Sequence, residues 1–537
     1  MYKSKKICYN SRRWENAFKR NKVLKCLLIL RGDTVLEKIG VIEIKTTSVK
    51  LSIVEVIRNK YFEVGRTIDM PINLTKDFYS DMFIKPAVIK DISAILAVYK
   101  KIIEENECTE TVCLATEIIS EAKNQNGFIN ELAVVSGFKF EVLTAEEEIN
   151  SIYTSVINSF NRPKGVIVNI GDYTTKIIAY NRRNILASLV VPYGSIKLYD
   201  ELKDKSFEER QEFVNEVFGK MISESEFKNQ LPEEYDIIGT GEVFKDFGSV
   251  CRKAKKYPME LIHNFEANKT DFDKVYSLIK TNVVGTSTKI KGISLQNSKY
   301  FPMGLQIMSA VLSNFENEEF VISKLNEVDG ILFNKVIALT LEKPISDTLG
   351  YSLQMINDFY DRKPNNSQHI YEISMVLFKQ LKVLHKLPRP YVRVLRIASY
   401  LSNAGYRVNV ENAEKVVFDI IKNSTIFGVA QTDIVLAGFV ALCKNSDNFN
   451  LSEWVRFKEY LTEEDLVAVK KLAVILKIAE ALDVTGFGCV KDISCDILGD
   501  SVIMKTIVEG DASFEINYTM LCGSDFKKAF GKNLEVL

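Results

Sequence analysis

Residues 40–53 read GVIEIKTTSVKLSI, and residues 165–178 read GVIVNIGDYTTKII. In each stretch an apolar strand is followed by a short turn rich in Thr, Ser, Asp or Gly and then by a second apolar strand, which is the pattern of a β-hairpin. When the two turns are aligned, Glu43 corresponds to Asn169 and Lys50 corresponds to Lys176. An internal repeat of this kind predicts two related halves in the N-terminal part of the chain.

The turns of such hairpins are suited to binding phosphate. Their amides and hydroxyls can converge on an anion, and an acidic residue at the end of the first strand can hold a metal ion. Two copies facing one another across a cleft would hold a phosphate chain from both sides. The alternative is two ordinary hairpins in a β-rich core, and the pattern alone leaves both interpretations open.

The segments around both hairpins favour α/β halves. Apolar residues recur at helical spacing over Ile89–Glu104. Thr144, with Glu147 three residues later, forms a capping-box pattern that predicts a helix start. The other elements that we expect are strand Thr111–Thr116, helix Ser120–Leu132, strand Phe140–Leu143, strand Leu186–Pro192, helix Gly194–Leu202 and strand Ile237–Gly241.

The composition is that of an ordinary globular protein. Of the 537 residues, 46% are hydrophobic and 26% are charged, and 70 Lys and Arg balance 70 Asp and Glu. This balance gives no reason to expect a nucleic-acid or membrane partner, and no apolar run reaches the roughly 18 residues of a membrane span. Nine cysteines without a CxxC pair, and only three histidines, argue against a zinc site or a multi-histidine metal centre. They predict reduced thiols and therefore a cytoplasmic protein.

Seven segments, in the right order, resemble the Ppx/GppA family of exopolyphosphatases and guanosine-pentaphosphate phosphohydrolases. The first phosphate loop of the family, D-[IL]-G-S-N-S, corresponds to EIKTTS at 43–48. The second loop, D-I-G-G-G-S-T-E, corresponds to NIGDYTTK at 169–176. The other five correspond to ATEIISEAKN (115–124), LTAEEEI (143–149), VPYGSIKL (191–198), GTGEV (239–243) and LQNS (295–298).

The resemblance implies an α/β fold with a duplicated actin/Hsp70-like ATPase core of ribonuclease H-like halves, an all-α HD-like domain and a small C-terminal β/α element. The expected boundaries are 1–38 for a basic N-terminal extension, 39–160 and 161–345 for the two actin-like subdomains, 346–490 for the HD-like domain and 491–537 for the C-terminal element. In that last element, Gly499-Asp500 is a hairpin turn signal. The alternating segment Ala512–Tyr518 is expected to belong to a β-rich cap, and a short helix is expected at Asp525–Phe530.

The family hydrolyses a terminal phosphoanhydride of polyphosphate or of the pentaphosphate alarmone, with Mg²⁺. The resemblance implies that Glu148 is the general base that activates water, and that Glu43 and Asp172 are ligands of the Mg²⁺. The expected phosphate-binding residues are Thr46, Thr47, Ser48, Gly171, Thr174, Thr175 and Gly241. The expected partners are polyphosphate or a guanosine polyphosphate, and a homodimer is expected.

Several residues depart from the family pattern where the chemistry would occur. The replaced positions are Lys45 for a glycine, Ser120 for a phosphate-binding arginine, Asn169 for an aspartate, Asp172-Tyr173 for two glycines and Gln296-Asn297-Ser298 for Arg-Glu-Gly. Each lost charge-assisted contact costs about 1.5–3 kcal/mol. In the HD-like domain, Ser402-Asn403 replaces the family's metal-binding pair, and His369 and Asp483 are expected to be structural.

Three functions therefore remain open from the sequence. The first is an exopolyphosphatase-like phosphoanhydride hydrolase with impaired activity. The second is a catalytically inactive family member that binds a nucleotide or polyphosphate as a regulator. The third is a structural interaction protein whose cleft is filled by Lys45 and Tyr173.

Overall fold

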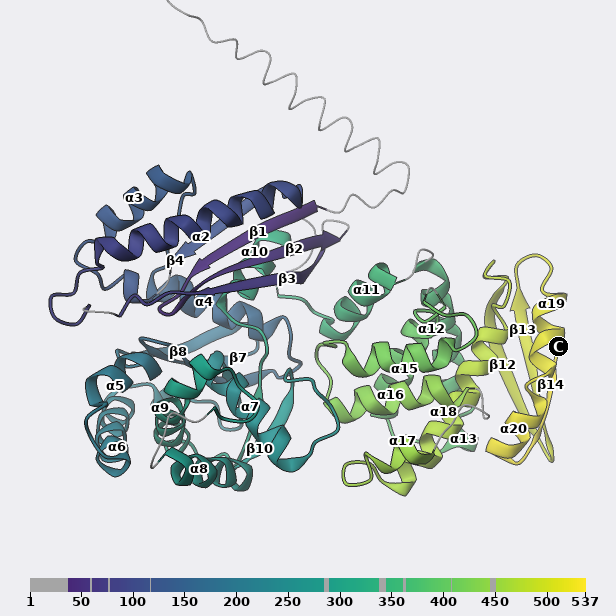
Figure 1. Cartoon of the computed structure of the whole chain (residues 1–537). Coiled ribbons are helices and arrows are strands. Elements are labelled where there is room, and N and C mark those ends of the chain that lie inside the picture. The colour runs from purple at the N-terminus through teal and green to yellow at the C-terminus, as the bar shows by residue number, and fades with distance from the viewer. Residues whose placement is uncertain are drawn as a thin grey trace, which may run out of the picture. The chain divides into compact units, whose positions relative to one another are not determined.

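The computed structural model describes residues 37–57, 60–75, 78–115, 117–283, 289–337, 344–360, 364–406, 408–444 and 451–537. The basic extension expected at 1–38 lies almost wholly outside these residues. The chain forms two compact units (Figure 1). The first holds the residues up to Leu143 together with a segment that begins at Lys335, and the second holds Thr144–Asn334 with the C-terminal part of the chain.

The first unit is built on a five-stranded sheet in the order β3-β2-β1-β4-β5. Strand β1 pairs antiparallel with β2 and parallel with β4. The Tyr99 hydroxyl on α2 is buried and donates to the carbonyl oxygen of Val49 at 2.7 Å, which fixes this helix on the sheet. The elements are β1 (Glu37–Ile44), β2 (Ser48–Ile57), β3 (Tyr61–Pro71), α2 (Pro86–Glu105), β4 (Glu110–Ala115), α3 (Gln125–Ser136) and β5 (Glu141–Val142).

The helix expected from Ser120 begins later, at Gln125. A 3-10 turn over Glu117–Ile119 comes first. The Asn124 side chain then accepts from the Ile84 amide at 3.0 Å and donates to the Ile84 carbonyl at 2.9 Å. Because Asn124 is held by another segment of the chain, it ends the turn and α3 starts directly after it.

The second unit contains a six-stranded sheet in the order β10-β11-β9-β6-β7-β8. Strand β6 pairs antiparallel with β7 and parallel with β9, and β9 pairs parallel with β11. The order β8-β7-β6-β9-β11 repeats the order β3-β2-β1-β4-β5, so the predicted duplication is confirmed and the core has the actin-like fold. The strands are β6 (Lys164–Ile170), β7 (Thr175–Asn181), β8 (Asn184–Val191), β9 (Asp236–Thr240), β10 (Phe265–Asn268) and β11 (Glu319–Ile322).

Helices cover both faces of this second sheet, as Figure 1 shows. On one face, Ile149 and Ile152 of α4 pack with Ile167 and Ile178. The other face packs against the layer of helices that follows β8. Strands β6 and β7 are therefore buried along almost their whole length, and their continuous apolar sequence follows from this position. The helices are α4 (Ala145–Ile157), α5 (Ser195–Leu202), α6 (Phe207–Glu224), α7 (Glu242–Lys255), α8 (Lys269–Val283), α9 (Leu295–Leu312) and α10 (Glu327–Ile337).

The chain from Thr348 to Ala481 is helical, as the apolar spacing predicts. Helix α16 is buried on nearly every side because it lies inside the apolar core of this region. The assignment of these helices as HD-like stays a prediction. They are α11 (Thr348–Tyr360), α12 (Pro364–Gln380), α13 (Lys382–His385), α14 (Tyr391–Leu401), α15 (Ala413–Asn423), α16 (Gln431–Cys443), α17 (Leu451–Val455) and α18 (Glu463–Ala481).

His369 and Asp483 have the structural roles expected for them. The Nδ1 atom of His369 lies 3.2 Å from a carboxylate oxygen of Asp483, and its Nε2 lies 2.7 Å from the Val490 carbonyl oxygen. Asp483 also accepts from the Gly488 amide at 2.9 Å. These contacts join α12 to the segment that follows α18.

The C-terminal element combines a three-stranded sheet, in the order β12-β13-β14, with two short helices. The Gly499-Asp500 turn lies between β12 and β13, as predicted. The alternating segment Ala512–Tyr518, however, is not a strand, because Ser513–Met520 forms helix α19. The Asp511 carboxylate accepts from the Ser513 amide at 3.0 Å at the start of this helix. The elements are β12 (Val490–Leu498), β13 (Ser501–Val508), α19 (Ser513–Met520), α20 (Gly523–Phe530) and β14 (Asn533–Val536).

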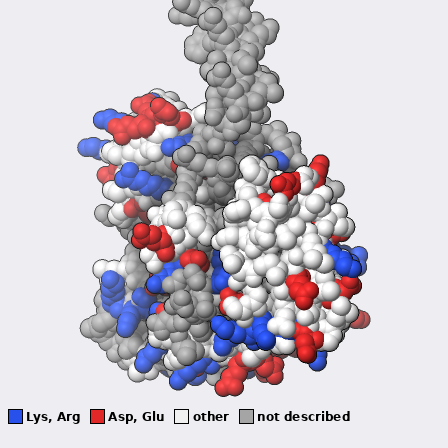
Figure 2. Space-filling view, turned by 90° about the vertical axis from the view of Figure 1, so that its right-hand side faces the viewer, with Lys and Arg blue, Asp and Glu red and all other residues white. Residues whose placement is uncertain are grey.

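Phe514 and Tyr518 of this segment form an exposed apolar stripe together with Leu521, which follows α19. Phe514 is 62% exposed, Tyr518 44% and Leu521 72%, and their spacing of four and three residues places them on one side of a helix. Figure 2 looks onto the side of the molecule that carries the C-terminal element and shows a broad uncharged area there. An apolar stripe of this kind is typical of an interaction surface.

No helix in the described ranges is long and apolar enough to cross a membrane. The cysteines in the described part of the chain are all free thiols, as predicted: Cys108, Cys113, Cys251, Cys443, Cys489, Cys495 and Cys522.

Candidate functional site

The second hairpin loop runs from Gly171 to Thr174, between β6 and β7. It is closed by a hydrogen bond from the Gly171 amide to the Thr174 carbonyl at 2.9 Å. The Thr175 hydroxyl donates to the carbonyl of Tyr193 at 2.8 Å, and the Ser195 hydroxyl donates to the carbonyl of Gly171 at 3.3 Å. The hydroxyls at the end of this loop therefore bond to the protein's own backbone.

The first turn of α5 packs directly on this loop. The Ser195 amide donates to the Gly171 carbonyl at 3.0 Å, and the Ile196 amide donates to the Asp172 carbonyl at 2.9 Å. A Cβ atom at Gly194 would lie 2.5 Å from the backbone of Asp172 and Tyr173, so only glycine permits this close approach. Helix N-termini commonly bind anions through these first amides, but here the amides of α5 bond to the loop carbonyls.

Tyr173 fills the position where the family has a glycine. The side chain is buried, at 3% exposure. The Lys197 ammonium lies 4.6 Å from the centre of the Tyr173 ring and 5.1 Å from the Tyr193 ring, and it donates to the Pro192 carbonyl at 2.8 Å. Cation–π contact therefore holds a basic side chain of the α5 segment against the loop tyrosine.

The candidate general base, Glu148, forms a buried ion pair. Its Oε2 lies 2.7 Å from the Lys176 ammonium, and the two side chains are 8% and 2% exposed. Glu148 stands in the first turn of α4, where the predicted capping box of Thr144 and Glu147 fixes the helix start. Lys176 lies in β7 two residues before Ile178, so both side chains point to the face of the sheet that α4 covers.

Lys176 also contacts the second hairpin loop. Its ammonium donates to the Thr174 hydroxyl at 2.7 Å. One buried lysine therefore contacts both the candidate base and a candidate phosphate-binding hydroxyl. The sequence analysis aligned Lys176 with the family's loop glutamate but gave it no role, although a lysine inside the apolar strand 175–181 was a signal in the sequence.

The Gly239–Gly241 segment lies beside the second loop. Gly241 has a φ of +90° at the start of α7. A Cβ atom there would lie 3.1 Å from Nδ2 of the Asn169 side chain and 3.0 Å from the Ile170 carbonyl oxygen. The Thr240 hydroxyl donates to the Leu325 carbonyl at 2.6 Å. Gly241 therefore lies beside the end of β6, where the second hairpin loop begins, and its role in phosphate binding stays a prediction.

The first hairpin loop lies in the first unit. The Lys45 amide donates to the Ser48 carbonyl at 2.8 Å, and the carbonyls of Thr46 and Thr47 accept from the amides of Leu74 and Ile72 at 3.0 and 2.9 Å. Glu43 is 2% exposed, and its Oε1 lies 3.5 Å from the Lys45 ammonium. Both loops therefore combine an acidic side chain with a lysine from the same unit.

The donors of the second loop do not fit a magnesium ion. Mg²⁺ prefers carboxylate and water oxygens, whereas the strand-end residue is the amide Asn169 and the ammonium of Lys176 occupies the carboxylate of Glu148. Within the described ranges, no three His, Cys, Asp or Glu side chains converge on one point. The assignment of Glu43 and Asp172 as metal ligands stays a prediction.

An acidic residue that the sequence analysis missed lies close to a family segment. Asp246 on α7 accepts from the Asn297 amide at 2.8 Å. Burial raises the pKa of this carboxyl to about 7, and the nearby Glu242 adds to the shift. The spacing of four residues from Glu242 to Asp246, directly after Gly241, was the available signal.

The fold and the two related hairpins define a protein with a duplicated actin-like core. Comparison with known families agrees, because the model of the Ppx/GppA phosphatase family matches residues 68–338. That match covers half of the chain, and the chain therefore belongs to the Ppx/GppA family.

Similar proteins support the fold. The Ppx/GppA family member of Aquifex aeolicus is 20% identical, covers 57% of this chain and 100% of its own, and has a TM-score of 0.50. An exopolyphosphatase from Cytophaga hutchinsonii is 15% identical, covers 57% of this chain and 99% of its own, and has a TM-score of 0.52. Retrograde regulation protein 2 of Saccharomyces cerevisiae is 23% identical over 243 residues, which are 42% of this chain and 41% of that protein.

Proposed function

We propose that this chain is a non-hydrolysing member of the Ppx/GppA family and acts by interaction with protein chains rather than by turnover. The observation that carries the proposal is the buried contact of 2.7 Å between the Lys176 ammonium and Glu148. A general base must accept a proton from an attacking water. A carboxylate in a buried ion pair is a poor proton acceptor, because protonation forfeits the attraction of the pair.

The other loop residues support the same conclusion. A missing general base typically costs about 10²–10⁴-fold in rate. Further losses come from the neutral Asn169 at the strand end and from Ser120 at the family's arginine position, at about 1.5–3 kcal/mol for each charge-assisted contact. Since about 1.4 kcal/mol is a factor of ten, these losses together remove most of the catalytic advantage.

The interaction role is supported by the apolar stripe of Phe514, Tyr518 and Leu521 on α19. The occupant that we propose for this stripe is a second copy of the chain. Phe514, Tyr518 and Leu521 carry no charge, so two copies of the stripe meet without like-charge repulsion and can pair in a symmetric dimer. The side of the molecule that carries the C-terminal element is shown in Figure 2. Size-exclusion chromatography with light scattering is expected to give a dimer, and Phe514→Ser with Leu521→Ser is expected to give a monomer. A monomeric wild-type chain at all concentrations would overturn this part.

Mg²⁺-dependent hydrolysis of polyphosphate or a guanosine polyphosphate is the second candidate. It is favoured by Glu43, an acid retained at the end of the first strand, whose buried Oε1 accepts no hydrogen bond among the described residues and lies 3.5 Å from the Lys45 ammonium. It is also favoured by the retention of Glu148 in the first turn of α4.

Phosphate release decides between the two candidates. The purified chain is incubated with Mg²⁺ and long-chain polyphosphate, and separately with guanosine pentaphosphate. The blanks are Glu148→Gln and the double variant Glu148→Gln with Lys176→Met, which leaves no unpaired buried charge at this position. We expect the wild-type rate to equal that of the blanks, with the fold of all three checked by circular dichroism. Turnover above both blanks contradicts the proposal.

A melting experiment tests binding without turnover, since a ligand that binds only the native state raises the melting temperature. We expect polyphosphate and guanosine pentaphosphate to cause no shift that depends on the second hairpin loop, because the hydroxyls of Thr174 and Thr175 bond within the protein. A shift without turnover that is lost in Thr174→Val with Thr175→Val would replace the interaction role by that of a phosphate-binding regulator.

A further inference from the structure

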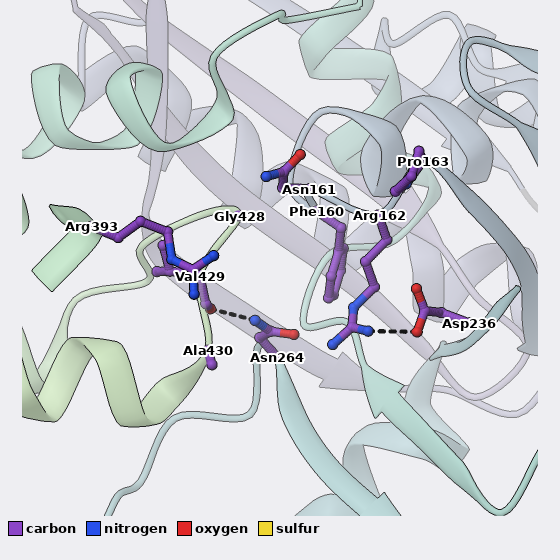
Figure 3. A pocket seen from close by; sticks show the side chains of 10 residues that line it. All are labelled: Phe160, Asn161, Arg162, Pro163, Asp236, Asn264, Arg393, Gly428, Val429 and Ala430. Carbon is purple, nitrogen blue, oxygen red and sulfur yellow. Dashed lines mark hydrogen bonds and ion pairs between the residues drawn. The ribbon is translucent and has the colours of Figure 1, made fainter. Parts of the chain in front are cut away.

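A pocket in the second unit is lined by no residue of the hairpin loops. It has a volume of about 240 Å³ and is formed where the α4–β6 connection, the turn before β10 and the start of α16 meet (Figure 3). It is lined by Phe160, Asn161, Arg162, Pro163, Asp236, Asn264, Arg393, Gly428, Val429 and Ala430. Its size lies just below the range of about 300–1,000 Å³ that is usual for drug-sized ligands, so a small ligand fits it.

Asn264 points to the kind of ligand. The residue is 6% exposed, and its amide nitrogen donates to the Val429 carbonyl. A carbonyl can only accept, so the amide orientation is fixed and the Oδ1 atom faces away from Val429. Figure 3 shows this oxygen on the side of Arg162. Oδ1 is buried and has no hydrogen-bond donor in the described structure, and such an atom costs about 1–3 kcal/mol unless a ligand or water satisfies it.

The conformation of Asn264 is held firmly. Its φ is +56°, in the left-handed region, which asparagine adopts more readily than most residues. Its backbone N–H donates to the Ile322 carbonyl at 2.8 Å. The neighbouring turn is tied to α16 by Gln431, whose side chain donates to the carbonyls of Leu261 and His263 at 3.0 and 2.9 Å. The acceptor therefore has a fixed place in the pocket wall.

Two guanidinium groups supply the donors. Arg162 and Arg393 lie on opposite sides of the pocket in Figure 3. Arg162 is oriented by Asp236 at 2.7 Å and Glu266 at 3.1 Å, and Arg393 lies 3.1 Å from Asp433. A guanidinium has five N–H donors, so these ion pairs orient the two forks without using all their donors. The three carboxylates outnumber the two arginines, so a ligand here is held by directed N–H donors and not by net charge.

We propose that this pocket binds a phosphoryl group that keeps a proton, with hydrogen phosphate as the simplest ligand. A tetrahedral oxyanion can accept from donors on two sides at once, whereas a planar carboxylate presents both oxygens on one side. The retained proton donates to Asn264 Oδ1.

The requirement for a proton gives a sharp test. Sulfate has the same shape as phosphate but carries no proton at neutral pH, so it cannot donate to Asn264 Oδ1. Calorimetric titration of the full chain at constant ionic strength is expected to show binding of inorganic phosphate and at least about tenfold weaker binding of sulfate. Glycerol phosphate tests whether a small organic phosphate is accepted as well as free phosphate.

Arg393→Gln is expected to weaken phosphate binding about tenfold or more, since it removes a charge-assisted contact. The matched control is Arg389→Gln, because Arg389 is an exposed arginine on the same segment that does not line the pocket. Arg162→Gln, with its fold checked by circular dichroism, is a second variant that should lose affinity in the same way.

Three results would overturn the proposal. The first is equal affinity for phosphate and sulfate, which removes the role of Asn264. The second is unchanged affinity in Arg393→Gln and Arg162→Gln. The third is that no phosphate binds, or that lactate, a hydroxycarboxylate, binds in its place. Because neither variant touches the hairpin loops, the outcome does not depend on whether the chain hydrolyses phosphoanhydrides.

Discussion

The Lys176 ammonium lies 2.7 Å from Glu148 Oε2, and both side chains are more than nine-tenths buried. The first hairpin carries a lysine at the corresponding position, Lys50, and allows a comparison. Lys50 in β2 holds the same register opposite Glu43 as Lys176 in β7 holds opposite Asn169. Lys50 is only partly buried, whereas Lys176 is covered by α4 and meets the acid of that helix. A strand lysine that is partly exposed in the first half is an internal counter-ion in the second.

Lys176→Met is expected to destabilise the protein by about 3–5 kcal/mol, because it leaves the Glu148 carboxylate buried without its partner. Adding Glu148→Gln should recover most of this loss, since no buried charge then remains. Urea denaturation followed by circular dichroism measures both variants. Lys505→Met is the control, because its pair with Asp496 is more than half exposed on both sides and should cost less than about 1 kcal/mol. Equal losses in Lys176→Met and Lys505→Met would show that burial does not govern the pair.

The two hairpins and their duplication could be predicted from the sequence, because the apolar repeats mark the strands that pair. The start of α4 could also be predicted, since the Thr144 and Glu147 pattern specifies its own hydrogen bonds. Local patterns failed where another part of the chain decides the outcome. Asn124 delays α3 by bonding to Ile84. The alternation in 512–518 suits a strand, but in helix α19 Ile516 packs against the core while Phe514 and Tyr518 are exposed.

The candidate site shows the same limit more strongly. The carboxylate that pairs with Lys176 lies outside the strand 175–181, on α4. This partner, Glu148, is reached only after the sheet and α4 have packed. The family resemblance indicated Glu148 as a base, but the ion pair that alters its chemistry depends on packing between two elements and was not visible in either motif alone.

Gly194→Ala is expected to destabilise the second loop. The added methyl group would lie 2.5 Å from the backbone of Asp172 and Tyr173, so the loop and α5 must separate, at a cost of about 1–3 kcal/mol. Thermal unfolding measures the change. Gly219→Ala in α6 is the control with the opposite sign, because its surroundings are open and alanine favours a helix by about 0.5–1 kcal/mol. A neutral Gly194→Ala would show that α5 is not held against the loop.

His369 is expected to make stability depend on pH. Its hydrogen bond with Asp483 raises the pKa of the imidazole above its usual 6.5. A raised folded-state pKa means that the stabilisation is fully present below about pH 6.5 and is lost as the pH rises through the raised value. Between about pH 6 and about pH 8.5, the wild-type chain should therefore lose stability relative to His369→Gln.

Comparison with the variant is needed because the pKa values of two other histidines are lowered rather than raised. Burial lowers the pKa of His263 to about 4 and also lowers the pKa of His385. Their contributions to stability are lost as the pH falls, and they are present in both proteins, so they cancel in the difference. Parallel stability curves for the wild type and His369→Gln would contradict the assignment.

Asp246→Asn is expected to stabilise the protein at alkaline pH. Burial raises the pKa of this carboxyl to about 7, so the folded state binds the proton more tightly than the unfolded state, whose pKa is about 3.9. Stability from this group is therefore full below about pH 4 and falls as the pH rises to about 7.

The asparagine of the variant removes the ionisation. Its side-chain oxygen can still accept from Asn297, which in the wild type donates to the Asp246 carboxylate at 2.8 Å. Urea denaturation at about pH 8 should show a gain of up to about 4 kcal/mol, while at about pH 4 the two proteins should be nearly equal. A gain of the same size at both pH values would mean that packing, and not the charge of Asp246, decides the difference.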